Sequence, residues 1–135
     1  MNSLERYLAV LSGKPCDIIP RTPILMQYAA EFIGSNYGAF ASDHKILVEA
    51  NLRCAEHFDF DQVSAISDPY RETEGFGGEI TYVRDGVPRC TAPLAHTQDL
   101  TVLRTPDPLR STRMRDRVDA VRLFKEKIGG QRSIL

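Results

Sequence analysis

The sequence has no tryptophan, few cysteines and no long apolar run. Its 135 residues include only 3 cysteines: Cys16, Cys54 and Cys90. An odd and small number of thiols excludes a disulfide-built secreted scaffold and predicts reduced cysteines. No stretch reaches the roughly 18 apolar residues of a membrane helix, and the first twenty residues lack the apolar centre of a secretory signal. We therefore expect a cytoplasmic protein without a disulfide or a membrane partner.

Neither sign of charge dominates the chain. Lys and Arg total 17 against 18 Asp and Glu, a formal net charge of -1, which disfavours a generally basic nucleic-acid-binding protein. The charge is unevenly spread, because residues 104–135 hold 9 basic and 4 acidic side chains. With 42% hydrophobic and 26% charged residues, the composition is that of a globular protein, and the length predicts one domain over residues 1–135.

The first part of the chain alternates between helix and strand signals. Asn2, followed three residues later by Glu5, is a helix-capping pattern that opens an amphipathic helix ending before Gly13. The apolar run of residues 21–27 predicts a short buried strand. The glycines within residues 28–41 predict a broken helix or a surface lid.

A buried helix and a second strand follow. Asp43 is a good N-cap for a helix to about His57, which is apolar on almost all sides and should be buried on more than one. Residues 61–67 predict a strand that ends where Asp68 precedes Pro69, because an X-Pro step ends an extended segment. The Asp68 carboxyl group is therefore expected at the carboxyl end of this strand.

The second part predicts a hairpin, a long helix and the start of another strand. Two extended runs flank Asp85-Gly86, a dipeptide that favours a type I′ hairpin turn. A helix is expected from Pro106 to Gly129, with its arginines mostly on a solvated face. Its apolar face is expected to contain Met114, Val118, Val121, Phe124 and Ile128.

The order of these elements is that of an α/β protein. Helices that join successive strands are typical of a parallel sheet, and residues 133–135 begin one more apolar run. Two strands and the start of a third cannot close a barrel. Their open edges would need cover from another chain or a further segment.

Five short segments in this order resemble the uroporphyrinogen decarboxylase superfamily. They are residues 21–26, 60–69, 74–77, 86–88 and 99–108. That superfamily contains the haem-pathway decarboxylase and the cobalamin-dependent methyltransferases that serve coenzyme M or tetrahydrofolate, all on a (β/α)₈ TIM barrel. A complete barrel takes roughly 200 to 400 residues. The resemblance therefore implies an N-terminal part of one barrel domain, with an N-terminal helix and a β-hairpin inserted after the second strand.

The resemblance also implies site residues. The decarboxylase has its essential aspartate in a Ser-Asp pair at the end of the second barrel strand, which matches Ser67 and Asp68. Reasoning from the residues agrees, since the carboxyl ends of barrel strands face the mouth where active sites assemble. A carboxyl group there can bind pyrrole N–H groups or hold a proton donor. The alternative, which does not exclude this role, is that Asp68 caps the following helix. Gln27 and Tyr28 are the substrate-binding neighbours expected beside it.

One departure favours the methyltransferase-like branch. The decarboxylase carries arginines just after its first strand, where the bidentate guanidinium binds substrate carboxylates. Here Gln27 and Glu31 stand at those places, and residues 26–32 contain no cation. We therefore expect methyl transfer to a small thiol or tetrahydrofolate. Decarboxylation of uroporphyrinogen in porphyrin biosynthesis is the alternative, and a non-catalytic piece that needs an oligomer or a complementing fragment is the second.

No cofactor or metal is expected within residues 1–135 themselves. For a full-length family member, the resemblance implies methylcobalamin or a corrinoid protein as partner, and zinc bound in the second half of the barrel. Cys54 and His57 have the spacing of two metal ligands on a helix, but Cys54 falls on an apolar face and is expected to pack in the core. Five carboxylates are close together in the sequence and could bind a cation, but all of them except Asp68 are expected on solvated loops and a helical turn: Asp59, Asp61, Asp68, Glu72 and Glu74.

Overall fold

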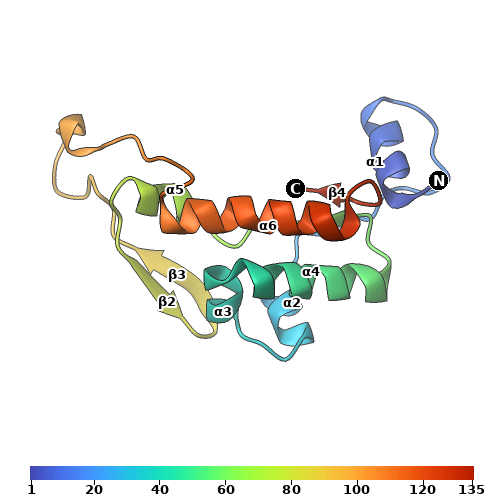
Figure 1. Ribbon diagram of the computed structural model, residues 1–135, viewed down its shortest axis with the longest axis horizontal. Helices are drawn as coiled ribbons and strands as arrows, with labels where there is room; N and C mark the ends of the chain where they lie inside the picture. Colours follow the sequence, from blue (N-terminus) through green and yellow to red (C-terminus); the bar gives the residue numbers. More distant parts are fainter.

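Two helices that lie side by side, α4 and α6, form the centre of the computed structural model, which describes all residues 1–135 (Figure 1). The β2–β3 hairpin lies near one end of this pair and α1 near the other. The helices are α1 (Ser3–Leu11), α2 (Gln27–Phe32), α3 (Tyr37–Ser42), α4 (His44–Phe58), α5 (Arg71–Gly75) and α6 (Thr112–Ile128). The strands are β1 (Gln62–Val63), β2 (Ile80–Val83), β3 (Gly86–Cys90) and β4 (Ser133–Ile134), with a 3-10 turn at Leu100–Val102.

The core lies between α4 and the elements around it. Helix α4 starts as expected, because the Asp43 side chain accepts a hydrogen bond from the Lys45 amide, and it ends at Asp59 with a left-handed φ of 54°. Its buried apolar residues pack with α2, α3, β1 and α6, so the expectation of burial on more than one side is confirmed. The largest fully buried apolar side chains include Phe40, Leu47 and Phe124.

Strands β1 and β4 pair in parallel, as expected of an α/β chain. Gln62 lies opposite Ser133 and Val63 opposite Ile134, and the Ala65 amide extends the pairing by donating to the Leu135 carbonyl at 2.8 Å. The two two-stranded sheets do not close into a barrel. The fold is therefore mixed α/β with a short parallel sheet.

The prediction of a strand at residues 21–27 is wrong, because the structure has no regular strand there. The segment is irregular until α2 begins at Gln27. One backbone hydrogen bond, from the Asp61 amide to the Arg21 carbonyl at 2.8 Å, ties it to the chain just before β1. Pro20 and Pro23 have no N–H group, so they cannot extend this single bond into a ladder.

The glycine-rich stretch that follows is a broken helix and not a surface lid. Helices α2 and α3 are separated at Gly34, whose φ of 73° suits glycine. Four residues of α3 are buried: Tyr37, Gly38, Phe40 and Ala41. Helix α3 packs against α4 and the hairpin, and so it is part of the core.

The hairpin is confirmed, but its type I′ turn is wrong. Val83 pairs with Gly86, which puts Arg84 and Asp85 at the centre of the turn. A type I′ turn needs a positive φ at both central residues, and neither has one. A register irregularity between Thr81 and Val83 accommodates the different turn.

The expected start and buried face of α6 are both partly wrong. Residues 107–111 form a turn, because the Asp107 side chain accepts from the Leu109 amide and its carbonyl accepts from two further amides, so the helix begins only at Thr112. The buried residues of α6 are Arg113, Ala120 and Phe124. Val121, expected on the apolar face, is 40% exposed.

A buried ion pair joins α1 to the start of the parallel sheet. The Arg6 guanidinium donates to Asp61 at 2.5 Å and to Asp17 at 2.7 Å, and the Arg21 amide donates to Asp61 at 2.7 Å. The Asp61 side chain is fully buried, which corrects its expected solvated position. None of the helices is both long enough and apolar enough to cross a bilayer.

The contact of α3 with the hairpin yields a stability test. A Cβ atom on Gly38 would lie 2.7 Å from the Val83 carbonyl oxygen, whereas one on Gly86 would meet only a Val83 methyl group at 3.6 Å. Gly38→Ala should therefore lower the free energy of unfolding by about 2 kcal/mol through overpacking, measured by urea denaturation. Gly86→Ala is the matched control and should change it by less than about 1 kcal/mol. Equal effects of the two substitutions would contradict the packing of α3 on the hairpin.

Candidate functional site

Asp68 lies in a buried polar cluster at the end of the extended segment that follows β1. Its side chain is fully buried. Oδ1 accepts hydrogen bonds from Arg113 Nη1 at 2.8 Å and from the Tyr70 amide at 3.1 Å. Oδ2 accepts from Arg113 Nη2 at 2.7 Å and from Ser67 Oγ at 2.6 Å. The carboxylate is thus held by four donors, two of them from one guanidinium.

Arg113 reaches this carboxylate because α6 turns its first residues toward the core. Arg113 is 3% exposed and shares a buried helix face with Ala120 and Phe124. Its Nη2 also donates to the Ala41 carbonyl at 3.1 Å, and its guanidinium lies 5.5 Å from the centre of the Tyr82 ring. The expectation that the α6 arginines are solvated is therefore wrong for Arg113.

A second buried arginine continues the cluster. Arg71, which is 1% exposed, donates through Nη2 to Ser67 Oγ at 3.1 Å. Its Nη1 donates to the Arg113 carbonyl at 2.7 Å and to Asp116 Oδ2 at 2.9 Å. Ser67 Oγ therefore accepts from one arginine while it donates to the carboxylate that the other arginine holds. Two arginines and two aspartates share this interior with their charges balanced.

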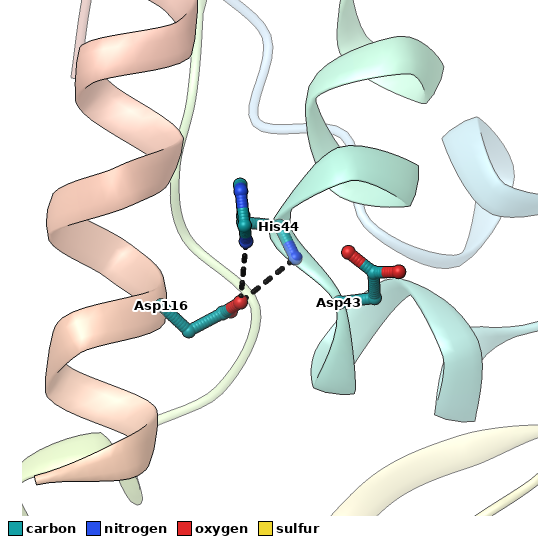
Figure 2. A group of neighbouring side chains, drawn as sticks. All are labelled: Asp43, His44 and Asp116. Atoms are coloured by element: carbon teal, nitrogen blue, oxygen red, sulfur yellow. Dashed lines mark hydrogen bonds and ion pairs between the residues drawn. The ribbon is translucent and has the colours of Figure 1, made fainter.

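The other oxygen of Asp116 binds the start of α4. Oδ1 accepts from the His44 amide at 2.9 Å and lies 2.8 Å from His44 Nδ1, the two contacts drawn in Figure 2. A carboxylate at Nδ1 favours the imidazole tautomer with its proton on that nitrogen. Arg71, Asp116 and His44 thereby connect α5, α6 and α4.

A cation site could be built from the side chains of Asp43, His44 and Asp116, but their potential ligand atoms already take part in hydrogen bonds. One ligand atom from each lies within 4.8 Å of the others. However, Asp116 already accepts from Arg71 and His44, and Asp43 accepts from the Lys45 amide at 2.8 Å. A cation would displace these donors and leave the buried Arg71 without its counter-charge. The group therefore fits an ion-pair network and not a metal centre.

The hydrogen bonds control the ionisation of the cluster. Burial raises the pKa of Asp68, but hydrogen bonds from Arg113 and Ser67 outweigh it and lower the pKa to about 2. Burial, together with the charge of Asp68, raises the pKa of Tyr37. Asp68 is therefore a carboxylate, and Tyr37 a neutral phenol, throughout the neutral pH range.

A small polar cavity of about 170 Å³ adjoins the cluster on the hairpin side. Its lining includes Ser42, His44, Tyr82, Thr112, Arg113 and Asp116. Arg113 therefore contacts both the Asp68 carboxylate and the cavity, while Asp68 does not line the cavity.

The structure brings only some of the predicted site residues together. Ser67 and Asp68 are in contact, and the Ser67 carbonyl accepts a hydrogen bond from the Tyr37 hydroxyl. That hydroxyl also lies 3.3 Å from Met26 Sδ, so Tyr37 bridges Ser67 to the residue before α2. Tyr37 is therefore the link between the two predicted strand ends.

Gln27 and Tyr28 lie on the exposed face of α2. Gln27 Nε2 donates to Glu31 Oε1 at 2.8 Å. Tyr28 is 52% exposed, and its ring packs at 6.1 Å from Phe32 and 6.0 Å from Phe58. Both side chains are open to solvent and are not hydrogen-bonded to the Asp68 cluster.

The predicted core role of Cys54 is confirmed. Cys54 is completely buried among apolar side chains, where burial raises the pKa of its thiol. His57, its suggested partner as a metal ligand, is exposed and packs its ring against Phe32 and Phe58.

Three residues of the cluster, Arg71, Arg113 and Asp116, are absent from the predicted site. The available signal was the spacing of Arg113, Ala120 and Phe124, which lie seven and four residues apart and so share one face of a helix. Arg71 offered no such signal, since a single arginine four residues after Ser67 is equally consistent with a solvated helical turn.

Comparison with known proteins gives a family and a fold. The family model described as Uroporphyrinogen decarboxylase (URO-D) matches residues 2–135. Among solved structures, a methyltransferase from Methanosarcina mazei is similar, with a TM-score of 0.82 and 21% identity. The match covers 99% of this chain and 41% of that one, so the chain spans less than half of the methyltransferase's length. No curated protein matches the chain.

The low pKa of Asp68 makes a testable contribution to acid stability. The folded-state pKa of about 2 lies below the ordinary 3.8, so this stabilisation is complete above about pH 4 and is lost as the pH falls toward 2. The free energy of unfolding, measured by urea titration, should therefore fall over this window. It should fall less steeply in Asp68→Asn, while Asp85→Asn, at an exposed carboxylate, should keep the wild-type slope. An unchanged slope in Asp68→Asn would contradict the ion pair.

Proposed function

The chain belongs to the uroporphyrinogen decarboxylase family, and from that membership we propose that it supplies the N-terminal part of a (β/α)₈ barrel that transfers a methyl group from a corrinoid to a small thiol or tetrahydrofolate. The parallel pairing of β1 with β4, connected through α6, is the arrangement that a barrel repeats. The irregular segment 21–26 beside β1 is the place of the first barrel strand. The β2–β3 hairpin is then the insertion after the second.

The observation that carries the methyl-transfer proposal is the lack of a free cation beside the candidate site. Residues 26–32 contain no Lys or Arg, and Gln27 is hydrogen-bonded to Glu31. The nearby buried arginines, Arg71 and Arg113, are each paired with an aspartate. A porphyrinogen with many carboxylates needs unpaired guanidinium groups, whereas a small acceptor does not. The similar fold of the Methanosarcina mazei methyltransferase supports the same choice.

We assign Asp68 the role of a catalytic carboxylate at the mouth of the barrel, with Ser67, Gln27 and Tyr28 on the substrate side. Asp68 is ionised at neutral pH and so can orient a polar group of the acceptor as a hydrogen-bond acceptor. Exposed Gln27 and Tyr28 offer an amide and an aromatic face to a bound molecule. Methylcobalamin, free or on a corrinoid protein, would be the methyl donor.

The residues of this chain do not fit a zinc ion. The cluster of potential ligands within 4.8 Å contains no cysteine, and Cys54 is enclosed in the core. Thiolate and imidazole ligands are those that zinc prefers. A zinc ion that activates a thiol acceptor would therefore need ligands other than Asp43, His44, Asp116 and Cys54.

Decarboxylation of uroporphyrinogen is the second candidate, and the Ser67-Asp68 pair at the end of the extended segment after β1 favours it. The exposed apolar side chains of Leu8, Leu11 and Ile19 are consistent with a further proposal, that the protein works as a homo-oligomer or with a complementing polypeptide.

Methyl transfer and decarboxylation are different reactions, so assays of the same protein distinguish the two candidates.

Parallel assays separate the two reactions. The protein, incubated with methylcobalamin and either 2-mercaptoethanesulfonate or tetrahydrofolate, should demethylate the corrinoid, followed by its absorbance change. Asp68→Asn should lower this rate at least about tenfold, because a neutral amide cannot replace the carboxylate acceptor. Asp85→Asn, at an exposed site, should leave it unchanged. Loss of carboxyl groups from uroporphyrinogen without corrinoid demethylation would replace the methyl-transfer proposal by the decarboxylase.

A further inference from the structure

We propose that Arg113 is the positioning residue of this site: its guanidinium holds the Asp68 carboxylate in one orientation, so that Asp68 acts as a fixed hydrogen-bond acceptor and not as a proton donor. The catalytic meaning of this inference rests on the proposed function. Its physical content, the control of Asp68 by Arg113, can be measured without turnover.

The geometry of the pair leaves the carboxylate no freedom to rotate. The two Nη atoms of Arg113 donate to the two oxygens of Asp68 at 2.8 and 2.7 Å. Such a bidentate pair is planar and directional, which a single lysine ammonium cannot reproduce. The Tyr70 amide and Ser67 Oγ add one donor to each oxygen.

Arg113 is itself held in place and cannot turn toward a ligand without breaking the pair. Its Nη2 donates to the Ala41 carbonyl, its backbone carbonyl accepts from Arg71, and the Tyr82 ring covers its guanidinium. Of its three nitrogen atoms, only Nε has no hydrogen-bond partner in the protein. Asp68 therefore occupies the bidentate edge of the guanidinium, which is not free to bind a substrate anion.

The groups around Asp68 together favour its ionised form. The titratable groups that face it directly or act on it through the cluster are Tyr37 of α3, His44 of α4, Arg71 of α5, Tyr82 of β2, Cys90 of β3, and Arg113, Asp116 and Arg117 of α6. Asp116 is the one other carboxyl group among them, and it is paired with Arg71. The arginines are cationic, and burial raises the pKa values of Tyr37 and Cys90, so neither adds a negative charge near neutral pH. The carboxylate therefore remains ionised in this surrounding.

This arrangement defines how a substrate can approach Asp68. Both oxygens already accept two hydrogen bonds, so an incoming N–H or O–H group must displace a present donor. Ser67 Oγ is the exchangeable one, because its hydroxyl can rotate and it also accepts from Arg71. Arg113 and the Tyr70 amide would keep the carboxylate in position during the exchange. Any proton that the reaction delivers must come from another group.

Carboxyl titration tests the inference directly. In protein with ¹³C-labelled aspartate, the Asp68 Cγ resonance, assigned by its loss in Asp68→Asn, should not titrate between pH 8 and 4. Arg113→Met keeps the length of the side chain but removes its charge, so the Asp68 pKa should rise by two or more units as burial is left unopposed. Arg113→Lys keeps the positive charge but loses the bidentate guanidinium, so it should raise the Asp68 pKa by a smaller amount. Arg122→Lys, on the same helix but 60% exposed and paired with Asp119, is the matched control and should change nothing.

The same variants separate positioning from a merely structural role. Arg113→Lys should lower kcat at least tenfold with little change in KM, and it should move the acidic limb of the pH–rate profile upward. Titration of wild-type Asp68 near its ordinary pKa, or an Arg113→Lys protein with wild-type titration and kcat, would overturn the inference. If Arg113→Met fails to fold, Arg113→Lys carries the test. A shifted Asp68 titration in a protein that transfers no methyl group would refute the proposed function and leave the control by Arg113 standing.

Discussion

The bidentate pair between Asp68 and Arg113 joins the end of the segment after β1 to the first turn of α6, two parts of the chain 45 residues apart. Removing two charges from water costs several kcal/mol per ion, which only good geometry and further hydrogen bonds can offset. Ser67, the Tyr70 amide and the Ala41 carbonyl provide those bonds. The pair therefore fixes the position at which the start of α6 packs. An apolar pair of the same volume could stabilise the fold equally but would not give this directional contact.

The second arginine extends this constraint to the remaining helices. Arg71 connects α5 to α6 through Asp116, and Asp116 connects α6 to the start of α4 through His44. The hairpin then covers the cluster by placing Tyr82 on Arg113. The elements that surround the candidate site are thus joined by ion pairs inside the protein, and its two buried arginines are neutralised by aspartates.

Several elements could be predicted because their signals are local. The α4 cap at Asp43, the break at Gly34 and the hairpin all depend on residues close together in the chain. The failure at residues 21–27 has a local cause, because Pro23 has no amide that could extend the bond at Arg21 into a ladder. The failure on α6 has a non-local cause, because the buried face of this helix is set by what it packs against. An arginine on that face is buried only because an aspartate from a distant segment lies opposite it.

The residue patterns alone determined most of the helices, the hairpin, the parallel pairing of the last strand and the family resemblance. The strand expected over residues 61–67 is regular only at Gln62–Val63, so Ser67 and Asp68 lie at the end of the extended segment after it. Tertiary structure decided which charges are buried. Periodicity tells which residues share a face, but the energy of a buried charge depends on a partner whose position is known only after folding. For this reason Asp68 could be named from its neighbours in sequence, whereas the ion pairs that join Arg71, Arg113 and Asp116 around it could be found only in three dimensions.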